Sequence, residues 1–216
     1  MLFRSKLKLW VVYPERADKA PVVLVIHEIF GMTDWSNSVA DHLASQGFIA
    51  IAPDMISGIE GEGGAAQKVR ALSNADRVKR LNAARAYGIK LPAATGKIGC
   101  IGFCWGGSTS FLYAVSQPGL DAAVVCYGGA PDTALLKNAN APILGLYAGD
   151  DARVNMTIPD AEKELKAQGK SLEHEKFPGA GHGFFRQQTG RDGANLKAAT
   201  KGWAKAIAFF REHLGE

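Results

Sequence analysis

Residues 96–107 read G-K-I-G-C-I-G-F-C-W-G-G, a short apolar segment that ends in a cysteine between glycines. The apolar segment is typical of a buried strand, and residues 105–117 after it read as a helix. The spacing G-x-C-x-G from Gly102 to Gly106 is that of the nucleophile elbow G-x-S-x-G, with sulfur in place of oxygen. Such an elbow strains the backbone of its central residue, and small residues two positions away let strand and helix pass closely.

Four further apolar segments end in glycine, proline or an acidic residue. None alternates polar with apolar residues, which predicts strands buried on both faces. They are PVVLVIHE at 21–28, GFIAIAPD at 47–54, DAAVVCYGG at 121–129 and APILGLYAGDD at 141–151. Helical patterns separate them at 35–46, 65–89, 105–117, 158–168 and 195–213, the first capped by Thr33 or Asp34. This alternation predicts one α/β domain over 1–216, with a mostly parallel sheet and helices on both faces.

Composition narrows the function classes. The formal charge of +4 is spread along 216 residues, so no basic tract indicates nucleic-acid binding. No apolar run approaches the roughly 20 residues that span a bilayer. The first ten residues alternate charged and apolar side chains, which predicts an edge strand and not a signal peptide. Three cysteines do not indicate a disulfide framework, so we expect a cytoplasmic protein.

The remaining expectations concern partners. No Cys/His spacing fits a zinc site, so we expect no metal and no cofactor. We expect a small-molecule substrate, and a monomer or a weak dimer.

The position of Cys104 predicts a reactive thiol. At a helix N-terminus the peptide dipoles favour the thiolate and lower the pKa of the thiol. The alternative is a buried structural cysteine beside a tight turn. Cys100 and Cys126 lie inside predicted strands and are expected in the core. About 13 Å of strand separates Cys100 from Cys104, too far for a disulfide.

A cysteine nucleophile needs an imidazole as base, and the imidazole needs a carboxylate that orients it. In this architecture they follow the nucleophile as acid and then histidine. His182 lies in the loop F-P-G-A-G-H-G-F-F directly after a predicted strand, and we predict it to be the base. His174, in a predicted edge strand at 171–177, and His213, in the terminal helix, are expected to be solvated.

Two aspartates are candidates for the acid. Asp150 and Asp151 both follow the predicted strand that starts at residue 141, and spacing does not choose between them. Asp132 is a weaker candidate, because a turn or cap role suits it better.

Polar groups also follow the strand at 21–28. Glu28 stands at its end, either as a turn residue or as an active participant. In serine hydrolases of this architecture, this loop and the residue after the nucleophile each donate a backbone N–H to the oxyanion hole. The amides of Ile29 and Trp105 are therefore the predicted donors.

Five motifs together resemble the dienelactone hydrolase family, the cysteine-dependent branch of the α/β-hydrolases. They are H-E-I-F-G at 27–31, A-P-D at 52–54, G-F-C-W-G-G at 102–107, G-x-D-x-x-V at 149–154 and G-H-G-F at 181–184. The resemblance runs from about residue 21 to 190 and implies an α/β-hydrolase fold. It implies that Cys104 is the nucleophile, that Asp151 rather than Asp150 is the acid, and that His182 is the base.

The resemblance also implies residue roles that the pattern alone does not give. Glu28 would interact with the resting cysteine and help to generate the thiolate when substrate arrives. Arg186, four positions after His182, would hold a substrate carboxylate, for which its planar fork is suited. A second substrate arginine would come from the segment before the nucleophile, where the candidates are Arg70, Arg77 and Arg80. Trp105 departs from the family pattern, because it is bulkier than the aliphatic residue often found at that position, and Trp35 would add to an aromatic wall.

The implied activity is hydrolysis of an ester or enol lactone that carries a carboxylate, of the dienelactone (carboxymethylenebutenolide) type, through an acyl-enzyme on Cys104. One alternative is a broader carboxylesterase or thioesterase. Another, from a different class, is a non-enzymatic binding or redox-sensing protein that keeps a reactive thiol.

Overall fold

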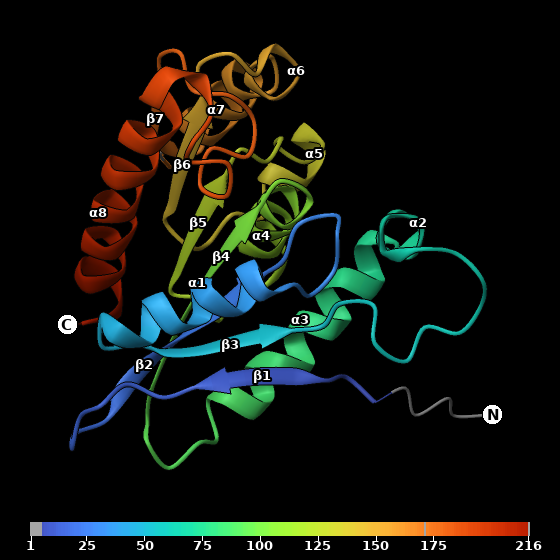
Figure 1. Cartoon of the computed structure of the whole chain (residues 1–216), viewed down its shortest axis with the longest axis vertical. Helices are drawn as coiled ribbons and strands as arrows, with labels where there is room; N and C mark the ends of the chain where they lie inside the picture. The colour runs from blue at the N-terminus through green and yellow to red at the C-terminus, as the bar shows by residue number, and fades with distance from the viewer. Residues whose placement is uncertain (1–5, 171, 216) are drawn as a thin grey trace.

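The computed structural model describes residues 6–170 and 172–215, and a seven-stranded sheet forms its centre (Figure 1). The strands lie in the order β1-β3-β2-β4-β5-β6-β7. Strand β1 pairs antiparallel with β3, and every other neighbouring pair is parallel. The strands are Leu9–Val12 (β1), Ala20–Ile26 (β2), Ile49–Pro53 (β3), Ala94–Phe103 (β4), Ala122–Cys126 (β5), Ile143–Ala148 (β6) and Leu172–Phe177 (β7). The expected mostly parallel sheet is confirmed.

Helices cover both faces of this sheet (Figure 1). One face is covered by α1 (Asp34–Ser45) and α8 (Ala194–Leu214), and the other by α3 (Asn74–Gly88), α4 (Trp105–Ser116) and α7 (Ile158–Ala167). The connections contain α2 (Ala65–Ala71), α5 (Thr133–Leu136), α6 (Ala152–Asn155) and the 3-10 turn η1 (Arg191–Gly193). No helix in the described ranges is both long and apolar enough to cross a membrane.

Strand β2 shows how one apolar run serves two layers. Val22 and Leu24 face the side covered by α3 and α4, whereas Val23 and Val25 face the side covered by α1 and α8. All four are at most 1% exposed. Burying each such side chain stabilises the fold by about 1.5–3 kcal/mol. A strand between two helical layers therefore needs apolar residues at every position, as the sequence has.

The predicted helix at 65–89 is wrong in one respect, because two helices occupy this range. Leu72 has extended backbone angles and ends α2. Ser73 then caps α3, since its Oγ accepts a hydrogen bond from the Asp76 N–H at 3.1 Å and donates to the Asp76 carboxylate at 2.6 Å. A cap of this kind starts a new helix. The same role at α1 belongs to Thr33, whose Oγ1 accepts from the Ser36 N–H.

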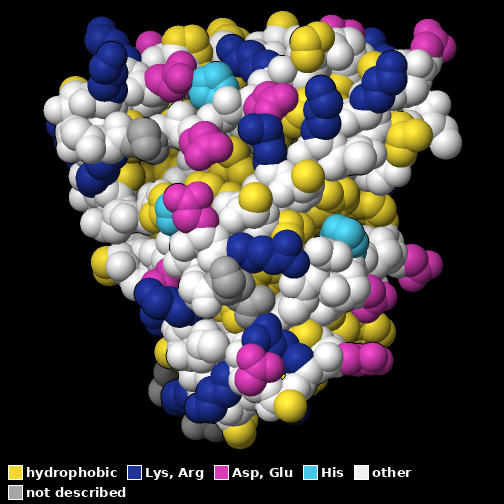
Figure 2. All heavy atoms as spheres, turned by 90° about the vertical axis from the view of Figure 1, so that its left-hand side faces the viewer, with side chains coloured by type: hydrophobic (Ala, Val, Ile, Leu, Met, Phe, Trp, Pro, Cys, Tyr) yellow, Lys and Arg dark blue, Asp and Glu magenta, His cyan; other side chains and the backbone are white. Residues whose placement is uncertain are grey.

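Both sheet edges were expected from the sequence. Strand β7 lies at one edge, and residue 171 of the predicted strand lies outside the described residues. The N-terminal edge strand predicted over residues 1–10 appears as β1 at 9–12, later than expected, because residues 6–8 are not in a strand; residues 1–5 of that prediction lie outside the described residues. On the face in Figure 2, blue Lys and Arg side chains are interspersed with magenta Asp and Glu side chains.

Candidate active site

Cys104 stands at the sharp turn between β4 and α4. Its backbone angles are φ 57° and ψ −115°, a conformation that costs a non-glycine residue on the order of 1–3 kcal/mol. The turn is held from both sides, because the Cys104 N–H donates to the Cys126 carbonyl and the Cys104 carbonyl accepts from the Ser108 N–H. The predicted strand–turn–helix elbow is confirmed.

The two glycines of the elbow are required by close backbone approach. A Cβ atom on Gly102 would lie 1.9 Å from the carbonyl oxygen of Gly106. A Cβ atom on Gly106 would lie 2.2 Å from the carbonyl oxygen of Ile26 in β2. These distances are far below van der Waals contact, so only glycine lets α4 start directly against the sheet.

The three cysteines differ in access. Cys104 is half-buried and lines a cavity of about 330 Å³. Cys100 and Cys126 are 0% exposed, and all three are free thiols. Burial raises the pKa of Cys100 to about 12, so this thiol stays protonated. Cys100 and Cys126 are core residues as predicted, whereas Cys104 is only partly buried.

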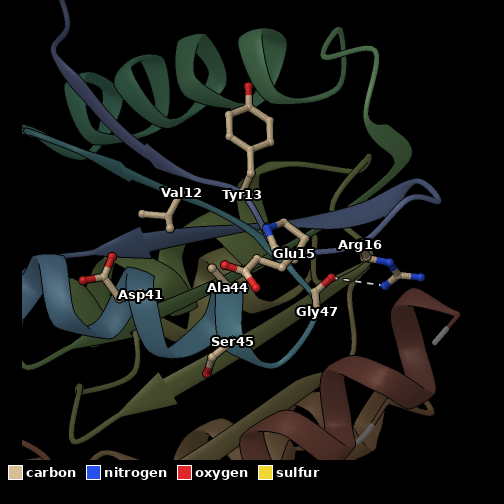
Figure 3. A pocket seen from close by; sticks show the side chains of 9 residues that line it. Val12, Tyr13, Glu15, Arg16, Asp41, Ala44, Ser45 and Gly47 are labelled. Atoms are coloured by element: carbon tan, nitrogen blue, oxygen red, sulfur yellow. Dashed lines mark hydrogen bonds between the residues drawn. The ribbon is translucent and has the colours of Figure 1, made fainter.

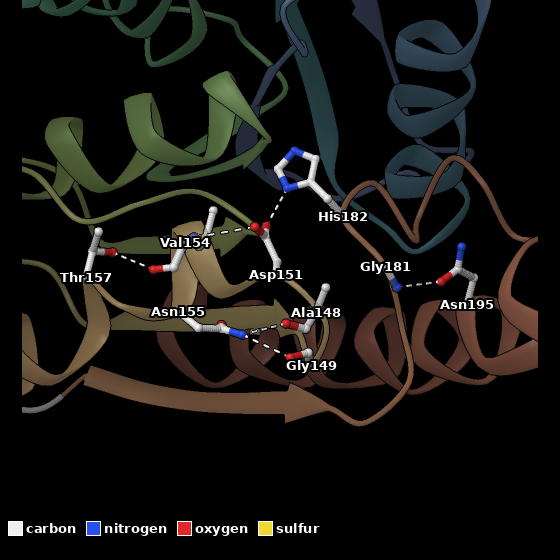
Figure 4. Close-up of polar contacts among 9 residues, drawn as sticks. All are labelled: Ala148, Gly149, Asp151, Val154, Asn155, Thr157, Gly181, His182 and Asn195. Atoms are coloured by element: carbon white, nitrogen blue, oxygen red, sulfur yellow. Dashed lines mark hydrogen bonds and ion pairs between the residues drawn. The ribbon is translucent and has the colours of Figure 1, made fainter.

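His182 and Asp151 come together at the carboxyl ends of β7 and β6 (Figure 4). His182 Nδ1 lies 2.5 Å from Asp151 Oδ2. Asp151 is 7% exposed, and its Oδ1 accepts a hydrogen bond from the Val154 N–H. Asp150 points elsewhere and forms a surface ion pair with Arg191 at 3.0 Å. Of the two candidate aspartates, the fold therefore brings Asp151 to the imidazole.

The His182 loop is anchored to α8. Asn195, 3% exposed, accepts from the Gly181 N–H at 2.9 Å and donates to the Gln187 carbonyl at 2.7 Å (Figure 4). The ring of Tyr127, at the end of β5, meets the His182 ring edge-on at 5.1 Å. Tyr127 has φ 39°, a second strained residue beside Cys104. The imidazole is thus held by a hydrogen bond, a loop anchor and an aromatic wall.

The surroundings of His182 favour its protonated form. A hydrogen bond with the Cys104 side chain is the largest influence and raises the pKa of the imidazole. Burial opposes this effect, and the bond to Asp151 adds to it. With Nδ1 bound by Asp151, the other ring nitrogen Nε2 is the one available to the thiol.

The other two histidines after Cys104 were predicted to be solvated, but both are partly buried. His174 Nε2 pairs with Glu162 of α7 at 2.8 Å, and the His174 side chain is 20% exposed. His213 is half-buried and packs its ring on Phe209 with the centroids 4.4 Å apart. Asp132 caps α5 through a hydrogen bond from the Ala134 N–H, as its predicted cap role requires.

The predicted oxyanion donors lie beside Cys104. Ile29 and Trp105 both line the cavity that Cys104 lines. Trp105 is the first residue of α4, where the N–H has no intrahelical acceptor. The Ile29 N–H has no hydrogen-bond acceptor among residues 6–170 and 172–215. Two amides without internal partners therefore stand at the elbow.

His27 fixes the direction of the Ile29 amide. This 1% exposed imidazole accepts from the Met55 N–H through Nε2 and donates from Nδ1 to the Glu28 carbonyl at 2.7 Å. The carbonyl of Glu28 and the N–H of Ile29 belong to one planar trans peptide unit and point in opposite directions. The carbonyl also accepts from the Gly31 N–H at 3.2 Å, so His27 and the Gly31 amide together turn the Ile29 N–H the other way. No sequence pattern singled out His27 for this role, although its position before Glu28 is a possible signal.

Glu28 and Arg186 form a buried ion pair. Arg186 Nε donates to Glu28 Oε2 at 2.6 Å, and the guanidinium lies over the Phe30 ring at 5.0 Å. The Glu28 side chain is 4% exposed and that of Arg186 is 33% exposed. The residue expected to bind substrate thus already binds the residue expected to activate the cysteine.

The three arginines before the nucleophile occupy different places. Arg70 lines the cavity beside Cys104. Arg77 lies over the Trp105 ring at 4.9 Å and donates to the Leu72 carbonyl. Arg80 donates to the Ser57 carbonyl at 2.9 Å. Of the three, the cavity therefore includes Arg70.

The two tryptophans of the predicted aromatic wall are placed differently. Trp105 lines the cavity and stacks on His27 with centroids 5.8 Å apart. Trp35 packs edge-on against Phe103, within the core on the α1 and α8 side. The structure therefore does not bring Trp35 into the cavity beside Cys104.

A larger cavity of about 510 Å³ lies between β1 and the end of α1 (Figure 3). Tyr13, Arg16 and Asp41 are among its lining residues, and Arg16 donates to the Gly47 carbonyl. This cavity lies where β3 begins, whereas ligands in such sheets bind at the carboxyl ends of the strands. In the described part of the chain, no group of three or more His, Cys, Asp or Glu side chains is arranged to hold a metal ion.

Known proteins share this fold and sequence pattern. The model of the dienelactone hydrolase family matches residues 7–214. A "Putative carboxymethylenebutenolidase" of Methylorubrum extorquens is 30% identical over 93% of this chain and 75% of its own length. A protein of the same name from Yersinia pestis is 31% identical over 97% of this chain and 85% of its own length.

A solved structure from the same family has a similar fold. The "Putative Dienelactone Hydrolase" of Klebsiella pneumoniae superposes with a TM-score of 0.82 at 27% identity, over 94% of this chain and 92% of its own. These findings support a hydrolase over the alternative of a non-enzymatic thiol protein. The chain belongs to the dienelactone hydrolase family, whose members are hydrolases of esters and lactones.

Proposed function

We propose that this chain cleaves ester or enol-lactone bonds through an acyl-enzyme on Cys104. The observation that carries the proposal is the arrangement of three groups: a strained cysteine that lines the cavity, an imidazole whose pKa the Cys104 side chain raises, and a carboxylate 2.5 Å from that imidazole. Nucleophile, base and orienting acid then come from three strands in the order that covalent catalysis uses on this fold.

The first half-reaction makes a thioester. His182 holds the thiol proton, and the Cys104 sulfur attacks the substrate carbonyl to form a tetrahedral oxyanion. The amides of Ile29 and Trp105 stabilise that oxygen, a contribution of about 3 kcal/mol for each donor. The intermediate collapses, the bond to the leaving oxygen breaks, and His182 gives its proton to the leaving alcohol or enol.

The second half-reaction releases the acid. His182 takes a proton from water, and the resulting hydroxide attacks the thioester carbonyl. Collapse of the second oxyanion expels the Cys104 sulfur and yields the carboxylic acid. Asp151 stays ionised throughout and keeps Nδ1–H oriented, so that Nε2 serves both transfers.

A carboxylate on the substrate is the specificity feature that we infer. Arg70 lines the cavity and is exposed, so its guanidinium can meet both oxygens of such a group. Arg186 uses only Nε for Glu28, which leaves its two terminal nitrogens for the same task. Glu28 is the fourth group of the mechanism: when a substrate carboxylate engages Arg186, Glu28 is released toward the thiol and helps to pass the thiol proton to His182.

The proposal is tested with an activated ester. Cys104→Ala should lower kcat/KM for 4-nitrophenyl acetate by roughly a thousandfold or more while thermal unfolding stays cooperative. Mass spectrometry of the acid-quenched wild type should locate the acyl group on Cys104. The matched control is Cys100→Ala, which removes a core thiol and should keep turnover. Undiminished activity of Cys104→Ala refutes the proposal.

A broader carboxylesterase or thioesterase is the second candidate, and the Glu28–Arg186 ion pair favours it. If that pair is permanent, Arg186 is a structural residue and selects no substrate. The two candidates differ in the ratio of kcat/KM for a lactone with a free carboxylate and for its methyl ester. Arg70→Met and Arg186→Met should each lower that ratio for a carboxylate-selective enzyme, and an unchanged ratio supports the broader esterase.

A further inference from the structure

A second cavity adjoins the one beside Cys104. Its volume is about 220 Å³, and it shares Ser108, Gly129 and Arg153 with the first cavity. Asn74 and Arg77 also line it. The two cavities together form one path that starts at the nucleophile and continues past Ser108.

Ser108 shows why the path is continuous. It stands on the first turn of α4, four residues after the N-cap residue Cys104, and its N–H donates to the Cys104 carbonyl at 3.1 Å. Its side chain lies on the face of α4 that borders both cavities. Ser108 is half-buried and lines both cavities. A substrate whose carbonyl reaches Cys104 can therefore extend along this face into the second cavity.

The charge of the second cavity is positive. Arg77 and Arg153 line it, and neither forms an ion pair with any residue that the structure describes. Asp132 is the one acidic residue in its lining, and its Oδ1 is occupied by the Ala134 N–H at the start of α5. The lining thus carries two guanidinium groups and one carboxylate, and that carboxylate already caps α5.

The two arginines also differ in how they are held. Arg77 lies over the Trp105 ring and donates Nε to the Leu72 carbonyl, which fixes the guanidinium plane and leaves the terminal nitrogens unused. Arg153 is exposed on α6, two residues after Asp151. A fixed cation and an exposed cation in the lining of one cavity suit an anion that enters from solvent.

We propose that this second cavity is a subsite for an additional anionic group on the substrate, bound by Arg77 and Arg153 and separate from the carboxylate held by Arg70 and Arg186. This assignment rests on the proposed function, because the subsite would bind the part of the substrate that extends from the scissile carbonyl past Ser108. The substrate class is then a polycarboxylate or phosphorylated ester. A simple monocarboxylate ester leaves the subsite empty.

Two probes that differ by one carboxylate test this assignment. One is the 4-nitrophenyl monoester of glutaric acid, and the other is the terminal 4-nitrophenyl monoester of tricarballylic acid, with uncatalysed rates subtracted. In the wild type, kcat/KM should be about tenfold or more higher for the tricarballylate ester, because charge-assisted hydrogen bonds to the extra carboxylate are worth that factor. Arg153→Met should bring the ratio close to one, and Arg153→Lys should give an intermediate ratio.

The control variant is Lys79→Met, which removes the same charge from an exposed position on α3 outside both cavities. It should keep the wild-type ratio. A ratio near one in the wild type, or the same raised ratio in Arg153→Met, overturns the subsite.

The subsite and the proposed function fail in distinguishable ways. If the wild type hydrolyses neither probe, the proposed function fails, and the subsite is judged by calorimetric titration with tricarballylate. Saturable binding that Arg153→Met weakens about tenfold supports the subsite on its own. Absence of saturable binding, or equal binding by both proteins, overturns it.

Discussion

Arg186 Nε donates a hydrogen bond to the buried carboxylate of Glu28 at 2.6 Å, across 158 positions of sequence. Glu28 follows β2 and Arg186 lies in the loop that carries His182. The pair therefore ties the loop after β2 to the loop that carries His182. It also means that two residues expected to act on different partners are in direct contact.

Breaking this ion pair should cost stability. Arg186→Met leaves the Glu28 carboxylate buried without a partner and should lower the free energy of unfolding by about 2–3 kcal/mol, at the low end because Arg186 is one-third exposed. The double variant Glu28→Gln/Arg186→Met removes the buried charge and should recover most of the loss. Urea unfolding measures both, and equal stability of wild type and Arg186→Met would contradict the pairing.

Asp151 should be essential to turnover and Asp150 dispensable. Asp151→Asn can present an amide N–H to the imidazole and stabilise the wrong tautomer, so kcat should fall by roughly a thousandfold or more. Asp150→Asn only breaks the surface pair with Arg191 and should keep kcat within about twofold. Steady-state kinetics with 4-nitrophenyl acetate compares them. Similar losses in both variants would mean that the acid is misassigned.

His27 should affect kcat more than KM. In His27→Ala the Glu28 carbonyl loses the shorter of its two hydrogen bonds and keeps the one from the Gly31 N–H, so the Ile29 amide is held less firmly. An oxyanion donor contributes in the transition state rather than in substrate binding, so kcat should drop about tenfold or more with little change in KM. A rise in KM at constant kcat would instead indicate a substrate contact.

The same histidine should make the fold sensitive to acid. Burial holds the pKa of His27 below its ordinary value of 6.5, and the pKa of His42 is lowered for the same reason. Below pH 6.5 the unfolded chain binds these protons while the folded chain does not, so the free energy of unfolding falls as pH decreases. Urea titrations at descending pH should show a smaller fall in His27→Ala than in the wild type. Parallel pH profiles would rule out a contribution from His27.

Gly102 should tolerate no side chain. Gly102→Ala places Cβ 1.9 Å from the Gly106 carbonyl oxygen, so α4 must move and the fold should lose more than about 3 kcal/mol or fail to form. The control is Gly64→Ala, because Gly64 has an ordinary φ of −74° and open space around its Cβ position. Thermal unfolding compares the stability of the two variants. A stable Gly102→Ala protein would show that the elbow has room for a Cβ atom at position 102.

Local pattern was enough for much of the framework. The apolar runs predicted the strands because a strand buried on both faces has apolar residues at every position. The glycines at 102 and 106 predicted the elbow because only glycine at these two positions lets β4 and α4 approach closely. The break at Ser73 was missed, since a cap inside a continuous helical pattern competes with propensity and wins only through its hydrogen bonds to Asp76.

Contacts between distant segments were decided by the tertiary structure. Sequence order predicted that His182 would meet a carboxylate, but the residues alone left Asp150 and Asp151 open until the end of β6 turned one inward and the other toward Arg191. The ion pair of Glu28 with Arg186 and the shared lining by Ser108 and Arg153 left no local signal. Local residue spacing determines which secondary structure each segment can form. Packing of the sheet determines which side chains contact one another, because those contacts depend on the register of strands that are far apart in the sequence.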